Sequence, residues 1–219
     1  IIGLPKQTIA DVENSVNELV NLKLEHISVY SLILEEGTML EELVRSGKLK
    51  LPEDKEERNM YWKVKNILEK NGYNHYEISN FAKHGSESKH NLDCWKQKEY
   101  VGFGVAAHSY TNGVRYSNIE NIEEYIKNYE EGKEEDNFVF HEKQTHNMKV
   151  KEYMMLGLRK IEGVCIQEFK EKFAANPIFV FKTELEKLVN EELLEVNGDY
   201  IKLTNKGLDL ANLVWEEFV

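Results

Sequence analysis

Apolar residues near the start of the chain follow first a strand pattern and then a helix pattern. Ile1-Ile2 is typical of the end of a buried strand, and a helical face follows Thr8, which can cap a helix together with Asp11. Residues 26–34 then form a β-branched, apolar run of strand length. Strand, loop, helix and strand in this order predict a βαβ unit of a parallel sheet, with its chemistry at the carboxyl ends of the strands.

Further elements follow within the first 131 residues. The pair Asn112-Gly113 lies between two short strand-like runs and is a strong signal for a two-residue hairpin. Spacing of apolar residues predicts, in order, a helix over 38–47, a helix over 53–71, a strand over 73–78 and a helix over 122–129.

Residues 132–141 are polar and acidic and show no period, so we place a linker at 132–144 between a domain at 1–131 and a domain at 145–219. The second domain is predicted to have winged-helix order: helices over 148–158, 166–173 and 181–189, a hairpin over 193–203 and a helix over 204–218.

DNA binding by this second domain would need a basic recognition helix. The carboxylates at or just after the third helix outnumber Lys182 and Lys187, and they would repel phosphates. These carboxylates are Glu184, Glu186, Glu191 and Glu192. We therefore interpret the domain as a packing or lid domain.

Composition excludes several classes of protein. With 219 residues and 25.6 kDa the chain can hold one large or two small domains. A net charge of −11 argues against nucleic acid as a partner. The apolar runs are too short to predict a transmembrane segment. Cys94 and Cys165 form no C-x-x-C pair, which indicates a reducing compartment, the cytoplasm, and no disulfide framework.

Two loops at the ends of predicted strands are candidate ligand sites. Residues 3–8 join a strand to a helix, where free N–H groups and the amide of Gln7 could hold a cofactor. An ordinary β-α turn is the alternative, and the loop alone favours it. Glu35 and Glu36 follow the next strand, but adjacent residues of an extended chain point to opposite sides and cannot form an acid-base pair. We therefore expect no hydrolase site there.

The stretch 76–110 gathers aromatic side chains, histidines and glycines, as a pocket for a planar ligand requires. His90 and Cys94 would share a face of a helix. They are too few for a closed zinc site, but one imidazole or thiolate is enough for an axial bond to haem iron. Alternatively, His90 is a hydrogen-bonded loop histidine and Cys94 is a small core residue. His108 likewise either lies near a ligand or is a histidine at the end of a strand. Flat apolar walls could come from Trp95, Tyr100 and Phe103.

Several motifs, in one order, resemble the oxygen-independent coproporphyrinogen III oxidase-like family of radical S-adenosylmethionine (SAM) proteins. The resemblance covers essentially the whole chain. The His-Asn-x-x-aromatic-Trp element is similar to the haem chaperone branch rather than to the true oxidase. Cys94 departs from the family, which usually has Tyr there. The motifs are residues 2–8, 28–32 and 76–82, His90-Asn91 with Trp95, residues 102–104 with 107–110, and residues 155–159 and 203–208.

This resemblance implies a fold and a set of cofactors. The fold is α/β: the C-terminal part of a partial (β/α) radical SAM barrel, followed by a small winged-helix-like domain. The family's three-cysteine motif for a [4Fe–4S] cluster is missing, so we expect a C-terminal fragment with the cluster ligands outside it. By position, Gln7 and the backbone at Ile33 are expected to contact SAM, and His90 is expected to contact haem.

Three classes of function stay open. A haem chaperone would bind haem and hand it to respiratory proteins. A true oxidase would decarboxylate the porphyrinogen, and its haem binding would be incidental. A non-enzymatic winged-helix module would bind a partner and do neither. We expect the first, and we expect the chain alone not to cleave SAM; no catalytic residue is identified.

Overall fold

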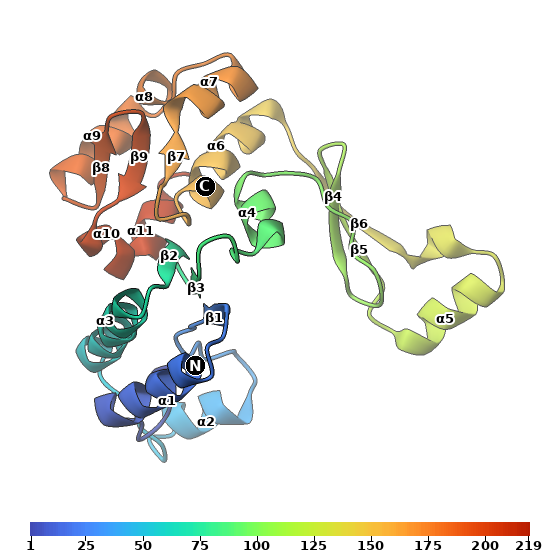
Figure 1. Ribbon diagram of the computed structural model, residues 1–219. Coiled ribbons are helices and arrows are strands. Elements are labelled where there is room, and N and C mark those ends of the chain that lie inside the picture. The colour runs from blue at the N-terminus through green and yellow to red at the C-terminus, as the bar shows by residue number, and fades with distance from the viewer. The chain divides into compact units, whose positions relative to one another are not determined.

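The computed structural model describes residues 1–219 (Figure 1). The chain forms two compact units, unit 1 (residues 1–87) and unit 2 (residues 88–219). Both units mix helices with short strands, as the α/β pattern predicts. None of the helices combines the length and the apolar character that a membrane span requires.

Unit 1 begins with the predicted pair of parallel segments, although they form a single bridge rather than a ladder. Ile2 pairs in parallel with Ser31, and backbone hydrogen bonds of 2.9 Å flank this bridge on both sides. Strand β1 (His26–Ser28) is shorter than the predicted run over 26–34. Beyond Ser28 the chain has no continuous neighbouring strand, so its hydrogen-bonded ladder ends there.

The helices of unit 1 confirm the sequence predictions closely. Helix α1 (Ile9–Asn21) carries the predicted capping box, because the Asp11 N–H donates to Thr8 Oγ1 at 3.2 Å and the Thr8 N–H donates to Asp11 Oδ2 at 2.9 Å. Helices α2 (Met39–Arg45) and α3 (Asp54–Lys70) follow. Helices α1 and α3 share one core with the sheet, built mainly from Val12, Val16, Ile27, Met60, Val64, Leu68 and Phe81.

Strand β2 (Asn74–Glu77) confirms the strand predicted over 73–78, and β3 (Asn80–Ala82) returns beside it. The sheet has the order β1-β3-β2 and is antiparallel. Polar groups are buried where β2 turns into β3: Glu77, the last residue of β2, is 1 % exposed and accepts a hydrogen bond from the side-chain amide of Asn80, the first residue of β3. These buried bonds fix the turn between β2 and β3.

Unit 2 opens with helix α4 (Lys89–Trp95) and a sheet of order β4-β5-β6. Strands β4 (His108–Thr111) and β5 (Val114–Asn118) form the hairpin that the sequence predicts. Asn112 and Gly113 both have positive φ, 52° and 73°, as a turn matched to the twist of the strands requires.

The segment predicted to be a linker, residues 132–144, holds defined structure. After helix α5 (Ile122–Glu130), it contains the 3₁₀-helix η1 (Glu134–Asn137) and strand β6 (Phe138–Lys143), which pairs antiparallel with β5. Strand β6 lies at the sheet edge and is largely exposed on both faces, so its sequence shows no alternation of apolar and polar residues. The domain limits proposed from the sequence stay a prediction.

The end of the chain has the predicted winged-helix order, with a short extra helix. A small antiparallel sheet of order β7-β9-β8 packs with the helices around Met154, Phe169, Leu188, Ile201 and Val214. The helix expected over 204–218 is divided at Leu210, where φ is −122°. The elements are α6 (His146–Gly157), β7 (Val164–Cys165), α7 (Ile166–Phe173), α8 (Pro177–Val180), α9 (Lys182–Asn190), β8 (Leu194–Asn197), β9 (Tyr200–Leu203), α10 (Asn205–Asp209) and α11 (Ala211–Glu216).

Candidate functional site

Helix α4 presents the predicted pair, His90 and Cys94, on one face. The helix begins after Ser88, whose hydroxyl accepts a hydrogen bond from the Asn91 N–H at 3.3 Å. One turn of helix separates His90 from Cys94, and His90 Nε2 lies 3.7 Å from the Cys94 sulfur. The His90 side chain is exposed, so its imidazole can reach a ligand outside the fold.

The electrostatics of α4 favour the imidazole over the thiol as a metal ligand. Burial raises the pKa of the Cys94 thiol, and the Asp93 carboxylate raises it further, while Arg115 opposes both effects. The thiol therefore stays protonated at neutral pH, and a protonated thiol is a poor ligand for a metal. Cys94 acts here as a small, half-buried neighbour of His90.

Two tyrosines extend the site from His90 toward the β4–β5 hairpin. The Tyr100 ring lies edge-on to His90 at 6.3 Å between centroids, and the Tyr110 ring lies 6.4 Å from Tyr100. The backbones of the two tyrosines exchange hydrogen bonds of 2.9 Å in both directions. The loop after α4 is thereby joined to β4 and gives the site a fixed aromatic side, as the sequence analysis expected of Tyr100.

Arg115 and Glu152 support this aromatic side, and sequence reasoning missed both. Arg115 Nη1 donates to the Tyr100 hydroxyl at 3.4 Å, and Arg115 Nη2 lies 2.5 Å from Glu152 Oε1. Glu152 also accepts from the side-chain amides of Gln97, at 2.7 Å, and Gln144, at 2.9 Å. No motif could have identified this network, because its members come from four separate segments of the chain.

Two other aromatic residues were expected to form walls of the ligand pocket, Phe103 and Trp95. Phe103 is open to solvent, whereas Trp95 packs inside unit 2. Phe103 is 89 % exposed. Trp95 lies on one side of Arg159, with its ring 5.0 Å from the guanidinium carbon, and Trp215 lies on the other side at 4.0 Å. Trp95 therefore holds the C-terminal end of α4 against the last helices.

The candidate SAM residues lie in unit 1, near the parallel bridge. The Gln7 side chain closes its own loop, because its Oε1 accepts from the Leu4 N–H at 3.1 Å and its Nε2 donates to the Ile1 carbonyl at 3.3 Å. The loop requires Gly3, whose φ is +80°. Ile33 follows the bridged Ser31 and is 74 % exposed. The bridge thus brings together the two segments from which SAM contacts are expected.

His108 is the first residue of β4. Its ring stacks against His141 of β6, with centroids 5.2 Å apart and planes at 14°. His141 Nε2 lies 2.9 Å from the Ser117 hydroxyl on the strand between them. Neither these histidines nor the two free cysteines belong to a group of three or more possible metal ligands.

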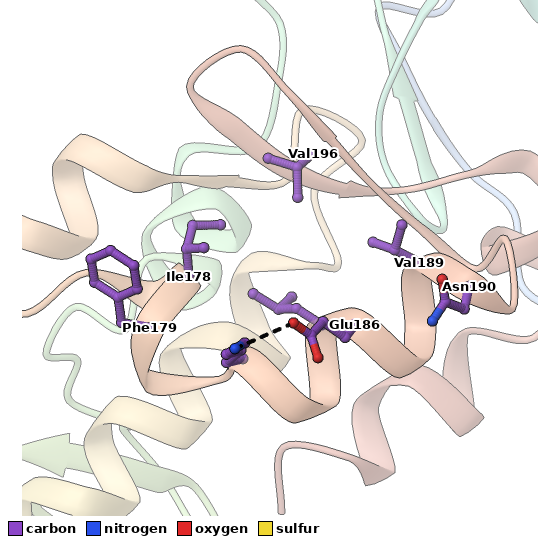
Figure 2. A pocket seen from close by; sticks show the side chains of 8 residues that line it. Ile178, Phe179, Glu186, Val189, Asn190 and Val196 are labelled. Atoms are coloured by element: carbon purple, nitrogen blue, oxygen red, sulfur yellow. Dashed lines mark ion pairs between the residues drawn. The ribbon is translucent and has the colours of Figure 1, made fainter.

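A separate apolar groove of about 380 Å³ lies between helix α9 and strand β8 (Figure 2). Ile178 and Phe179 border one end of it, and Val196 faces the helix from the strand. The charges on the groove side of α9 cancel, because Lys182 lies 3.7 Å from Glu186. The helix that would read DNA in a winged helix thus presents an apolar, neutral face, consistent with a packing role.

Comparisons with known proteins agree with the sequence motifs. The model of the HemN C-terminal domain matches residues 144–210. The chain is 39 % identical over 219 residues to the heme chaperone HemW of Lactococcus lactis subsp. lactis, and 38 % identical over 223 residues to the heme chaperone HemW of Bacillus subtilis. Each alignment covers 100 % of this chain and 57 % of the relative, so the chain spans somewhat more than half the length of these relatives.

A solved structure supports the fold. The radical SAM enzyme coproporphyrinogen III oxidase (HemN) from Escherichia coli aligns with a TM-score of 0.75 at 17 % identity, over 99 % of this chain and 53 % of that chain. At this identity the likeness shows the fold alone, and it confirms the predicted fold class. Residues 144–210 thus match the HemN C-terminal domain, and the whole chain is similar to part of the HemW relatives and shares its fold with part of the Escherichia coli HemN enzyme.

Proposed function

We propose that this chain is the haem-contacting part of a haem chaperone, with His90 as the ligand to the haem iron. The observation that carries the proposal is the exposed imidazole of His90 on α4, beside the fixed ring of Tyr100. Relatives named heme chaperones at 38 % and 39 % identity support it over the oxidase, whose similarity to this chain is one of fold at 17 % identity.

The residues around His90 fit haem as a cargo. An axial bond needs one neutral imidazole nitrogen, and Nε2 of an exposed histidine can supply it without rearranging the core. Tyr100 limits the ring orientations open to His90. Cys94 lies beside it and is half-buried, so the exposed imidazole is the group of the pair that we propose as the iron ligand.

The radical SAM cofactors fit this chain only in part. Gln7 retains one amide hydrogen and one carbonyl lone pair beyond its loop bonds, and the Ile33 backbone borders the same bridge, so both can contribute to a SAM site. A [4Fe–4S] cluster does not fit, because it needs several thiolates and this chain offers two distant, free cysteines. We place the protein in the cytoplasm, with respiratory proteins as haem acceptors.

Haem titration tests the ligand. Addition of haem to the 219-residue chain should give a Soret band, and His90→Ala should weaken haem binding by about tenfold or more, or about 1.4 kcal/mol, with a shifted band. His84→Ala, which removes another exposed histidine, is the matched control and should behave like the unchanged chain. An unchanged Soret band in His90→Ala would refute the assignment.

Replacing Cys94 tests the choice between nitrogen and sulfur. Because its thiol is protonated, Cys94→Ser should leave the position of the Soret band and the haem affinity nearly unchanged. The absorption spectrum of the ferric complex checks this. Loss of a thiolate-type spectrum on replacement would show that sulfur binds the iron.

A further inference from the structure

A second pocket of unit 2 begins two residues after the end of α4. It has a volume of about 590 Å³ and is lined by the loop after α4, the Asn112-Gly113 turn, and Lys149 and Lys172. Tyr110, whose ring neighbours Tyr100, also borders it. The pocket therefore borders the tyrosine pair whose other member, Tyr100, neighbours His90.

Three lysines and one carboxylate line this pocket, although the chain carries a net charge of −11; the carboxylate is Glu99, which accepts a hydrogen bond from the Asn112 N–H at 2.6 Å. Lys98 lies at the rim, but its ammonium group is neutralised by Asp93 at 2.6 Å. Lys149 is half-buried, and its ammonium group has neither a hydrogen-bond acceptor nor an ion-pair partner in the protein. Lys172 Nζ donates to the backbone carbonyls of Lys96 at 3.3 Å and Gln97 at 3.4 Å and lies 5.1 Å from the centre of the Tyr153 ring, but it has no carboxylate partner.

The two lysines are held near each other by the fold. Buried Gln97 adopts a left-handed conformation with φ of 54°, and its amide donates to the Lys149 carbonyl at 3.1 Å. Its own carbonyl accepts from Lys172. Burial lowers the pKa of Lys172, the charge of Lys149 lowers it further, and the Glu152 carboxylate opposes both effects. A fixed pair of like charges costs free energy that a bound anion would recover.

The turn beside Lys149 also leaves room for this charge. Gly113 lies against the Lys149 ammonium group, and a side chain at position 113 would collide with it. The glycine that the hairpin needs for its positive φ thus also keeps the Lys149 ammonium group in the pocket.

We propose that this pocket binds a carboxylate of the tetrapyrrole, with Lys149 and Lys172 as its donors. The inference rests on the proposed function. Haem carries two propionate groups on one edge of an otherwise apolar ring, so a protein that binds the iron at one point and a propionate at another fixes the orientation of the ring. The pocket beside the tyrosine pair supplies the second point, and Lys172 would exchange its hydrogen bond to the buried Gln97 carbonyl for one to the carboxylate.

Haem and its dimethyl ester distinguish this role from a structural one. The unchanged chain should bind haem about fivefold more tightly than the ester, which lacks both negative charges, and Lys149→Gln should remove that preference by weakening haem binding alone. Lys170→Gln, which removes an exposed charge from the same helix as Lys172, is the control and should keep the preference. Titrations at constant ionic strength and circular dichroism of each variant complete the measurement.

The outcomes separate this inference from the assignment of His90. Equal affinity of the unchanged chain for haem and ester, or equal weakening of both by Lys149→Gln, would overturn the carboxylate site. If Lys149→Gln removes the preference while His90→Ala leaves the Soret band unchanged, the carboxylate site stands and the iron ligand is wrong. If His90→Ala shifts the Soret band but the unchanged chain shows no preference for haem over the ester, the iron ligand stands and the carboxylate site is wrong.

Discussion

At the residue scale, the chain places titratable side chains in two contrasting environments. His90 is exposed on a short helix, whereas His75 is 8 % exposed and stacks on Phe81 with centroids 4.4 Å apart. His75 Nε2 lies 3.2 Å from the Tyr61 hydroxyl, but Nδ1 is buried without a partner. Burial lowers the pKa of His75 to about 4. One histidine is therefore suited to bind a ligand, and the other must stay neutral for unit 1 to fold.

Acidification should destabilise the protein through His75. Its pKa is lowered in the folded state, so the unfolded chain binds the proton more readily. The stabilisation is complete above the unfolded pKa near 6.5 and is lost as the pH falls toward 4, a loss of up to about 3 kcal/mol. His75→Gln cannot titrate, so the difference in unfolding free energy between the two chains should shrink from pH 7 to pH 4.5. If urea denaturation gives the same difference in unfolding free energy between the two chains at both pH values, this prediction is contradicted.

At the scale of elements, local signals in the sequence predicted local structure. Thr8 and Asp11 form the capping box, and Asn112-Gly113 forms the hairpin turn, because each signal acts within four residues. Edge strand β6 carries no such signal, since an exposed strand needs no alternation. The contacts of Arg115 with Glu152, and of Lys172 with Gln97, join segments far apart in sequence, and single-sequence patterns do not encode such pairs.

Removing the first helix cap should weaken unit 1 by a measurable amount. Thr8→Ala removes the hydroxyl that accepts from the Asp11 N–H, which should cost about 1 kcal/mol of stability. Thr8→Ser keeps the hydroxyl and serves as the control. Chemical denaturation measures both, and equal midpoints for the two variants would show that the cap does not contribute.

At the scale of the whole molecule, the chain holds the residues that we propose for SAM and haem contact, but its two free cysteines are too few for an iron–sulfur cluster. The expected SAM contacts, Gln7 and Ile33, belong to unit 1, and His90 belongs to unit 2. The order of motifs along the sequence predicted the family and the fold class, because motif order is a property of the whole chain. The surroundings of His90 could not be predicted from the sequence, since the contacts of Tyr100 and Arg115 depend on how loops pack.

The 219-residue chain alone should not cleave SAM. After iron and sulfide reconstitution under anaerobic conditions and addition of a strong reductant, no 5′-deoxyadenosine should form, because Cys94 and Cys165 cannot hold a cluster together. The Escherichia coli HemN enzyme, reconstituted in parallel, is the positive control. Turnover by this chain would mean that the cluster assignment is wrong.

The cation–π stack of Trp95, Arg159 and Trp215 also has an optical consequence. Two of the three tryptophans of the chain, Trp95 and Trp215, lie beside Arg159 in unit 2, the unit that carries His90, whereas Trp62 lies in unit 1. Haem absorbs in the range where indole fluoresces, so haem bound at α4 should quench the fluorescence of this tryptophan pair by energy transfer. The tryptophan pair is thus an intrinsic fluorescent probe for the proposed loading and release of haem, which needs no attached dye.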